Sequence, residues 1–289
     1  SHSTIMTRVV AKAGQDDLVV TSGQPGVLYV SGLPVEKNLF SGLRRKLKTI
    51  AEAFAITNGL KGKVEVVQAS SAALEMPDSS ISYVFTDPPF GGNIPYAEVN
   101  FINEAWLGRY TDRRGEAIVS SAQGKSLADY QQLLTASLTE ARRVLKVGGQ
   151  ATLVFHSATA GVWNALQTAY SDAGFSVKHA GILDKTQASF KQVTTSGAVK
   201  CDPVLLLEKC AFARGNEALD VWTVANQLRD LARKSADPKE RTAERLYSRL
   251  IAFYLTRNRP IPLDADAFYR WHREECRKEV AHHASRARA

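Results

Sequence analysis

Short apolar runs alternate with amphipathic segments along most of the chain. Each run is rich in Val, Leu, Ile and Phe and is bounded by Gly, Pro, Ser or charged residues, which is typical of a buried strand. Strands that alternate with helices predict an α/β fold with a mainly parallel sheet covered on both faces. The predicted strands are Val27 to Gly32, Val64 to Ala69, Ser82 to Asp87, Ala151 to Ser157, Phe175 to Leu183 and Pro203 to Lys209. The segments with helical spacing are Glu36 to Asn58, Ala97 to Arg109, Leu127 to Leu145 and Ala160 to Ala173.

The last two predicted strands differ from the others, because a long polar loop joins them and no helix is evident between them. We therefore predict that residues 175–209 form an antiparallel hairpin at one edge of the sheet. Beyond this hairpin the chain becomes helical and charged, and residues 210–289 carry 16 Lys and Arg against 11 Asp and Glu, a net charge of +5. The expected organisation is one domain over residues 1–210, followed by a basic helical region over residues 211–289.

The amino-acid composition is that of a folded protein, and it limits the cellular location and the class of partner that we expect. Of the 289 residues, 44% are hydrophobic and 23% are charged, which is enough to bury one large core. No run approaches the roughly 18 apolar residues that span a bilayer, and the three cysteines lack the spacing of a disulfide framework or a zinc site. We expect a cytoplasmic protein with no metal. The net charge of +8 favours a polyanionic partner, because Lys and Arg gain free energy by displacing counterions from phosphates.

The most informative motif is Asp87-Pro88-Pro89-Phe90, which follows the apolar run Ile81 to Phe85. It lies at the carboxyl end of a predicted strand, where open parallel sheets bind their ligands. Two prolines fix φ and remove two backbone donors, so the loop is stiff. The Asp87 carboxylate and the Pro88 carbonyl can each accept one hydrogen of a planar amino group, which directs the nitrogen lone pair at an activated methyl group. Phe90 offers a flat face to a base that has left the duplex.

Other residues are candidates for the same pocket. Gly91 and Gly92 follow the motif and permit a loop to close over a substrate. Asn93 and His156 are candidates for contact with the base or the cofactor, and an ordinary hydrogen-bonded histidine is the alternative for His156. Two serines, Ser70 and Ser71, follow the predicted strand at residues 64–69 and add polar groups at a strand end.

The polar loop between the last two strands is the candidate nucleic-acid contact. Its lysines can bind phosphates while its isolated aromatic ring stacks on a base. The alternative is an ordinary hydrated loop. The candidate residues are Lys185, Phe190, Lys191, Gln192 and Lys200.

These residues resemble those of large bacterial adenine-specific DNA methylases, in which a DPPF loop and a Gly-x-Asn segment precede a strand, a helix and a polar loop. The resemblance covers residues 27–209 as the catalytic half and extends to the helical segment Thr242 to Phe268. It implies a Rossmann-like methyltransferase fold with an antiparallel edge hairpin, an amine-binding loop at residues 87–90, S-adenosyl-L-methionine as cofactor and DNA as substrate. It also implies that a polar residue at the position of Ser70 and Ser71 meets the adenine of the cofactor. The matching segments are Phe85 to Asn93, Glu98 to Phe101, Val162 to Ala165 and Ser189 to Thr194.

One departure from this resemblance concerns the cofactor. Amino methyltransferases generally carry a Phe-x-Gly-x-Gly loop that holds the methionine part of the cofactor, and the sequence contains no such loop. We expect this chain to be the downstream part of a larger methylase, with an upstream domain or partner chain that supplies the loop. N6-adenine methylation of DNA is the preferred function and N4-cytosine methylation is close to it. Methylation of RNA or of a glutamine side chain, and a non-catalytic role in DNA binding or subunit packing, stay open.

Overall fold

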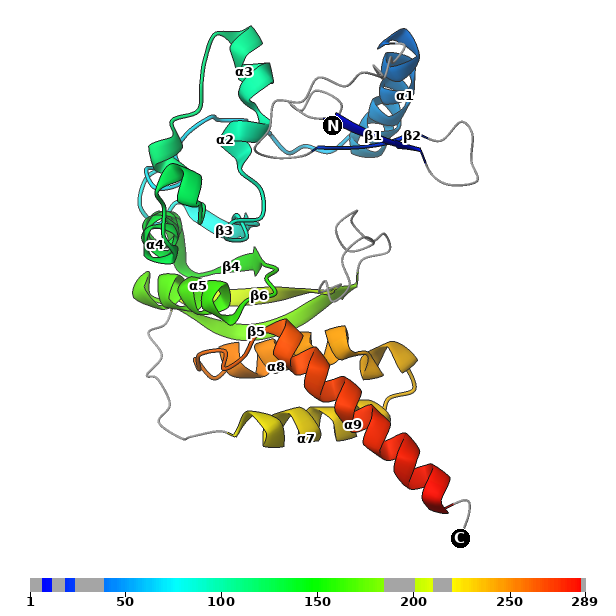
Figure 1. The fold of residues 1–289 in the computed structure, drawn as a ribbon. Helices are drawn as coiled ribbons and strands as arrows, with labels where there is room; N and C mark the ends of the chain where they lie inside the picture. Colours follow the sequence, from blue (N-terminus) through cyan, green and yellow to red (C-terminus); the bar gives the residue numbers. More distant parts are fainter. Residues whose placement is uncertain (1–6, 12–18, 24–38, 185–200, 210–219, 287–289) are drawn as a thin grey trace. The chain divides into compact units, whose positions relative to one another are not determined.

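A computed structural model describes residues 7–11, 19–23, 39–184, 201–209 and 220–286 (Figure 1). The chain divides into two compact units, and each has its own arrangement. The first unit combines Ser1–Ala69 with Pro95–Arg113, and the second combines Ser70–Ile94 with Arg114–Ala289. Within the ranges just given, no helix is both long enough and apolar enough to cross a lipid bilayer.

The described residues of the first unit form a small hairpin and three helices. Strand β1 (Thr7–Ala11) pairs antiparallel with β2 (Val19–Gly23), and neither strand is predicted from the sequence. The long helix α1 (Leu39–Thr57) confirms a prediction. The helix predicted over residues 97–109 is divided at Asn100 into α2 (Tyr96–Val99) and α3 (Phe101–Leu107).

Two strands predicted for the first unit have different outcomes. The run Val27 to Gly32 lies outside the described residues. The strand predicted over residues 64–69 is wrong, because residues 60–70 have no regular structure, and Val64 and Val66 are 91% and 92% exposed. An apolar run forms a strand only where a neighbouring strand completes its ladder. No described strand pairs with this segment.

The second unit contains a four-stranded sheet with the strand order β3, β4, β6, β5. Strand β3 (Ile81–Thr86) is parallel to β4 (Leu145–Val154), whereas β6 (Cys201–Lys209) is antiparallel to both β4 and β5 (Phe175–Asp184). This confirms four predicted strands and the antiparallel hairpin at the edge. The sheet is mixed rather than mainly parallel over the described strands, because β6 inserts between β4 and β5 and makes two of the three pairings antiparallel.

Two helices that pack against each other follow β3 and β4 in the chain, namely α4 (Leu127–Val144) and α5 (Ala160–Asp172). Helix α4 begins at a capping box, in which Ser126 Oγ accepts from the Asp129 amide and the Asp129 carboxylate accepts from the Ser126 amide. Its buried stripe repeats every four residues, as the helical period requires. The stripe consists of Tyr130, Leu134 and Leu138.

The segment before β3 is fastened to the last turn of α4 by one arginine. The Arg143 guanidinium donates to two backbone carbonyls at 2.9 Å and to two carboxylates, and its hydrogen bond lowers the pKa of Glu140 to about 2. These contacts fix the point at which β3 begins. The acceptors are the carbonyls of Leu74 and Met76 and the carboxylates of Asp78 and Glu140.

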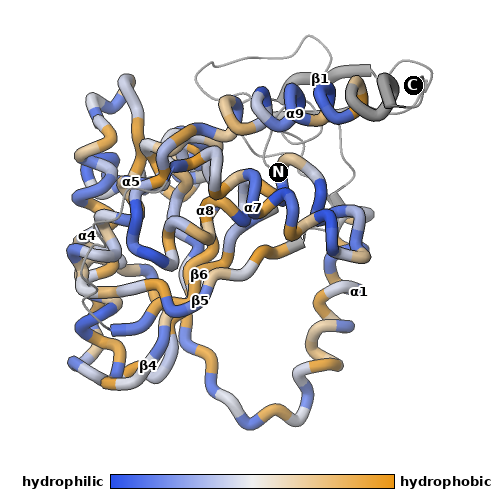
Figure 2. Tube along the Cα trace, turned by 90° about the horizontal axis from the view of Figure 1, so that it is seen from below, coloured by the Kyte–Doolittle hydropathy of each residue, from blue (hydrophilic) through white to orange (hydrophobic). Residues whose placement is uncertain are grey.

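The C-terminal part of the second unit is helical, as predicted. It contains α7 (Val221–Arg233), α8 (Ala243–Leu255) and α9 (Ala265–Arg286), and a 3-10 helix at Pro238–Arg241 lies between α7 and α8. Elsewhere in the chain, before α4, 3-10 helices lie at Arg113–Gly115 and Ser121–Gln123. Helix α8 lies against β5 and β6, and the hydropathy colouring shows apolar positions on all three elements (Figure 2). A single cluster of buried apolar residues therefore includes the sheet, α4, α5 and these helices.

Candidate functional site

The loop Asp87 to Phe90 begins directly after β3, whose last residue Thr86 pairs with Leu153 of the parallel strand β4. His156 follows the end of β4 by two residues. Because the carboxyl ends of parallel strands meet at the same edge of a sheet, the loop and His156 lie at that edge, as the sequence predicts. Asp87 is exposed, and the residues from Pro88 to Phe90 are half-buried.

The Pro89 carbonyl is held from two sides. It accepts a hydrogen bond from the Tyr130 hydroxyl at 2.5 Å and another from the Gly91 amide at 3.2 Å. Tyr130 lies in the first turn of α4 and is fully buried. Burial raises the pKa of Tyr130 to about 12, so the hydroxyl keeps its proton and remains a donor at neutral pH. This tyrosine is missed by sequence reasoning, although the capping box just before it marks where α4 begins.

The two glycines after the loop are close-packed. Gly91 is buried with φ of +65°, and a Cβ on it would lie 3.0 Å from Val162 of α5. A Cβ on Gly92 would lie 2.7 Å from the Val119 carbonyl oxygen, which is backbone and cannot move aside cheaply. The Val119 amide also donates to the Gly91 carbonyl at 3.3 Å. The glycines thus allow close approach of neighbouring backbone, which differs from the loop-closing role predicted from the sequence.

Aromatic rings hold Phe90 against the core. Its ring meets Phe155 edge to face at 5.1 Å, and Phe155 meets Trp163 in the same way at 4.9 Å. The His156 ring is tilted against Phe90 with the ring centroids 6.1 Å apart. Such edge contacts orient a ring more than burial alone does. Phe90 therefore has a defined orientation, and part of its surface remains accessible.

His156 is paired with a buried carboxylate. Its Nδ1 lies 3.0 Å from Oδ1 of Asp202, a residue of β6 that is 4% exposed. The contact brings the imidazole ring next to β6. The structure therefore places His156 beside the loop, between the Phe90 ring and Asp202.

The two predicted serines have local partners. Ser71 Oγ shares a hydrogen bond of 2.9 Å with Ser137 Oγ of α4, and Ser70 Oγ accepts from the Ala72 amide. Ser137 lies seven residues beyond Tyr130 on the same helix, or roughly 10 Å along its axis. The serines therefore lie away from the Tyr130 contact, and the structure does not gather them around the loop.

Of the remaining candidate site residues, the structure describes Asn93 but not those in the polar loop. Asn93 is exposed and follows the loop by three residues. Among the described residues there is no cluster of side chains suited to a metal ion. The predicted nucleic-acid contacts, Lys185, Phe190, Lys191, Gln192 and Lys200, all lie outside the described residues.

Comparisons with known proteins find similarity to solved structures alone, since no protein-family profile and no curated protein matches the chain. One similar structure is a candidate DNA modification methylase from Thermus thermophilus, with 15% identity and a TM-score of 0.29 over 60% of each chain. Another is a SAM-dependent methyltransferase from Methanosarcina mazei, with 14% identity and a TM-score of 0.31 over 57% of this chain and 77% of that one. A third is the cytosine-N4-specific PvuII DNA methyltransferase, with 12% identity and a TM-score of 0.33 over 57% and 60%.

This chain spans about 60% of the length of the Thermus protein. At TM-scores from 0.29 to 0.33, these similarities assign no function to it. The functional argument therefore rests on the residues of the loop and their neighbours.

Proposed function

We propose that this chain is the catalytic part of an S-adenosylmethionine-dependent methyltransferase that modifies the exocyclic amine of a flipped DNA base, with adenine N6 preferred to cytosine N4. One observation carries the proposal. The proline-stiffened loop ends β3 with its Pro89 carbonyl anchored, whereas no described residue donates a hydrogen bond to the adjacent Pro88 carbonyl. That carbonyl and the exposed Asp87 carboxylate are suited to accept from a ligand.

The chemistry at the amine needs two acceptors in a fixed geometry. The lone pair of an adenine or cytosine amino group is delocalised into the ring, so the nitrogen is a poor nucleophile. Hydrogen bonds from its two N–H groups to Asp87 and to the Pro88 carbonyl would draw the nitrogen toward tetrahedral geometry and concentrate the lone pair. Transfer of the methyl group would break its bond to the sulfonium sulfur, which would leave as a neutral thioether, and the nitrogen would lose one proton, for which the Asp87 carboxylate is an acceptor. Phe90 supports the base from one side.

The described residues fit the amine better than they fit the cofactor. When bound, S-adenosylmethionine supplies an activated methyl group. Ser71 is hydrogen-bonded to Ser137, and His156 lies beside Asp202, so the contacts of these side chains with the cofactor stay a prediction. We assign no described residue to the methionine part, and an upstream domain or partner chain that provides it remains part of the proposal.

The outer side of β3 supports this expectation of an additional element. Strand β3 is one of the two edge strands of the described sheet, and Phe85 on it is 64% exposed among the described residues. Exposed apolar side chains on an edge strand are unusual, because such edges invite pairing with another chain. A non-catalytic role in subunit packing is the second candidate function, and the same observation favours it.

The test is methyl transfer by the 289-residue chain from S-adenosylmethionine with a tritiated methyl group to double-stranded DNA, to RNA and to protein. We expect incorporation into DNA, and a fall of about 100-fold or more in Asp87→Ala, because one of two preorganised contacts to the amine is lost. Asp172→Ala, at the exposed end of α5, is the matched control and should behave like the wild type. Digestion to nucleosides and mass spectrometry separate N6-methyladenine from N4-methylcytosine.

Other results of this assay would distinguish between the alternative functions. Incorporation into RNA or protein but not DNA would support the corresponding amino methyltransferase. Equal activity of Asp87→Ala and the wild type would show that the loop is not the amine site. No incorporation, together with no heat of S-adenosylmethionine binding by calorimetry, would reject catalysis by this chain and support the non-catalytic role.

A further inference from the structure

The peptide group between Pro89 and Phe90 is more strongly held than the rest of the loop. Its carbonyl accepts from the Tyr130 hydroxyl at 2.5 Å and from the Gly91 amide at 3.2 Å. The Gly91 contact is local and moves with the loop. Tyr130 comes from a different element and is therefore the contact that ties the loop to the body of the protein.

Helix α4 is a rigid support for this contact. Its first turn is fixed by the capping box of Ser126 and Asp129, and Tyr130 is the next residue along the chain. Tyr130 is fully buried and is followed by the buried stripe of α4, so its side chain has little freedom. The hydroxyl therefore acts as a fixed donor.

Fixing the Pro89 carbonyl also fixes the carbonyl before it. Only the planar peptide bond and the φ and ψ angles of Pro89 separate the Pro88 carbonyl from the anchored peptide, and the Pro89 ring restricts φ. The same anchor precedes Phe90 and so limits the direction of its ring. One hydrogen bond thereby sets the relative orientation of the amine acceptor and the stacking surface.

We propose that Tyr130 is a positioning residue for amine methylation, which aims the Pro88 carbonyl at the amino group by holding the Pro89 carbonyl. This inference rests on the proposed function. Tyr130 acts through the loop and need not touch the substrate. Its role is preorganisation, so its loss should reduce the rate of the methyl transfer step more than the binding of either substrate.

The test variant is Tyr130→Phe, which removes the hydroxyl and keeps the ring in the core. We expect kcat to fall about 10-fold, since a hydrogen bond is worth roughly one decade in an equilibrium or a rate. The KM values for DNA and for S-adenosylmethionine should stay within about two-fold of the wild type. If the role of Tyr130 were purely structural, Tyr130→Phe would lower the melting temperature but would not lower kcat selectively at unchanged KM.

The matched control is Tyr247→Phe. Tyr247 is equally buried and donates to a backbone carbonyl, that of Leu263 at 3.2 Å, but it lies in α8 outside the loop contacts. It should lose a similar amount of stability and keep the wild-type kcat. Equal falls of kcat in both variants would show that stability alone explains the effect and would overturn the proposal.

A second measurement does not depend on activity. Hydrogen exchange of the peptide covering residues 86–93 should become several-fold faster in Tyr130→Phe and remain unchanged in Tyr247→Phe, because the Gly91 amide loses its fixed acceptor. Unchanged exchange in Tyr130→Phe would overturn the anchoring itself.

The outcomes separate this inference from the proposed function. If the wild type transfers methyl groups and Tyr130→Phe is equally active, the positioning role is wrong while the proposed function stands. If the wild type transfers none, the proposed function and this role in it both fail, and exchange shows whether the anchor exists.

Discussion

At the residue scale, the use of two consecutive prolines dictates how the candidate loop is stabilised. Neither Pro88 nor Pro89 has an amide hydrogen, so the loop cannot be fastened through its own donors at these positions. It must be held through its carbonyls by donors from elsewhere. The Tyr130 hydroxyl and the Gly91 amide supply them. A buried tyrosine suits this task, because its raised pKa keeps the donor proton in place.

Gly92 gives a prediction about the packing of this loop. A Cβ on Gly92 would lie 2.7 Å from the Val119 carbonyl oxygen, so Gly92→Ala forces the backbone to shift. We expect a loss of about 1–3 kcal/mol in the free energy of unfolding, as for other overpacked sites, and a fall in methyl transfer. Gly115→Ala is the control, since a Cβ there meets nothing within 4 Å, and it should change stability by less than about 0.5 kcal/mol. Urea denaturation measures both. A Gly92→Ala protein as stable as the control would mean that the close approach is absent.

The site was partly predictable from the sequence for a specific physical reason. Asp87 to Phe90 and His156 follow apolar runs, and strand ends can be read from such runs. Tyr130 occupies one turn of a helix with no motif of its own, and its contact with Pro89 depends on how α4 packs beside β3. Ser70 and Ser71 show how a wrongly predicted strand affects a site prediction. Their position after an apolar run predicts a ligand contact, yet that run forms no strand, so the ligand contact loses this support and stays a prediction.

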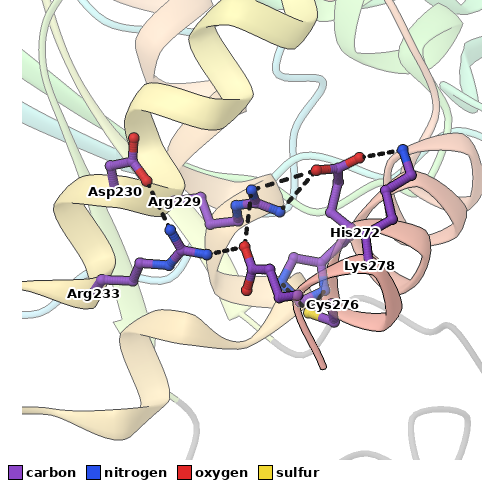
Figure 3. A network of polar contacts seen from close by, with 8 residues as sticks. Arg229, Asp230, Arg233, His272, Cys276 and Lys278 are labelled. Atoms are coloured by element: carbon purple, nitrogen blue, oxygen red, sulfur yellow. Dashed lines mark hydrogen bonds and ion pairs between the residues drawn. The ribbon is translucent and has the colours of Figure 1, made fainter. Parts of the chain in front are cut away.

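At the element scale, helices α7 and α9 are joined by a network of ion pairs (Figure 3). Arg229 lies 3.1 Å from Glu279 and 3.5 Å from Glu275, and Arg233 also contacts Glu279. The Arg229 guanidinium lies over the Trp271 ring at 5.6 Å. Because Arg229 is largely buried and one carboxylate serves two arginines, this network is stronger than isolated surface pairs.

Glu279→Gln tests the network. The substitution preserves the shape of the side chain and removes the charge that pairs with both arginines. We expect a loss of about 0.5–1 kcal/mol in the free energy of unfolding at low salt, and a smaller loss at about 1 M salt, where charges are screened within a few ångströms. Glu274→Gln, an exposed residue of the same helix, should have no measurable effect. The comparison requires urea denaturation of the three proteins at two salt concentrations. A loss that does not depend on salt would contradict the electrostatic explanation.

The elements of the second unit follow the sequence more closely than those of the first. Strands β3, β4, β5 and β6 are buried by one another and by helices, so their apolar runs report the local structure. The run at residues 64–69 has the same composition but lacks a neighbouring strand in the described residues, and it stays exposed. The parallel or antiparallel direction of each pairing was less predictable, because it depends on where the returning strand β6 inserts. The pattern of apolar residues in the sequence indicates which segments are buried, whereas contacts between residues far apart in the sequence determine how the strands pair.

At the scale of the whole second unit, the C-terminal helices and the sheet share one core. The side chain of Asn164 in α5 accepts from the Ile261 amide at 2.7 Å and donates to the Ile261 carbonyl at 3.1 Å. The Ala265 amide at the start of α9 donates to the Ala158 carbonyl at 2.9 Å. These backbone contacts join the helical segment to the end of β4 and to α5. The unit should therefore unfold as one cooperative body.

Buried tyrosines distributed through this body determine its response to alkali. Burial raises the pKa of Tyr130 to about 12, it raises the pKa of Tyr170 and of Tyr247 further still, and it also raises the pKa of Tyr254. In the unfolded chain each of these groups ionises near its ordinary pKa of about 10. Well below that pKa both states keep the protons and the tyrosines do not affect stability. Above it the unfolded state loses protons that the folded state retains, so ionisation favours unfolding.

We therefore expect the free energy of unfolding to be nearly constant from about pH 7 to 9 and to fall steeply above about pH 10, by up to about 1.4 kcal/mol per pH unit for each of the four tyrosines. Lys209 acts in the opposite direction, because burial lowers its pKa and the folded state then releases its proton first. The fall should exceed this opposing effect, since four tyrosines act against one lysine. Urea denaturation between about pH 7 and 11 measures the slope, and Tyr170→Phe should reduce it by about one quarter, because one of four ionisations is removed. A slope unchanged by Tyr170→Phe would show that the alkaline loss arises from other groups.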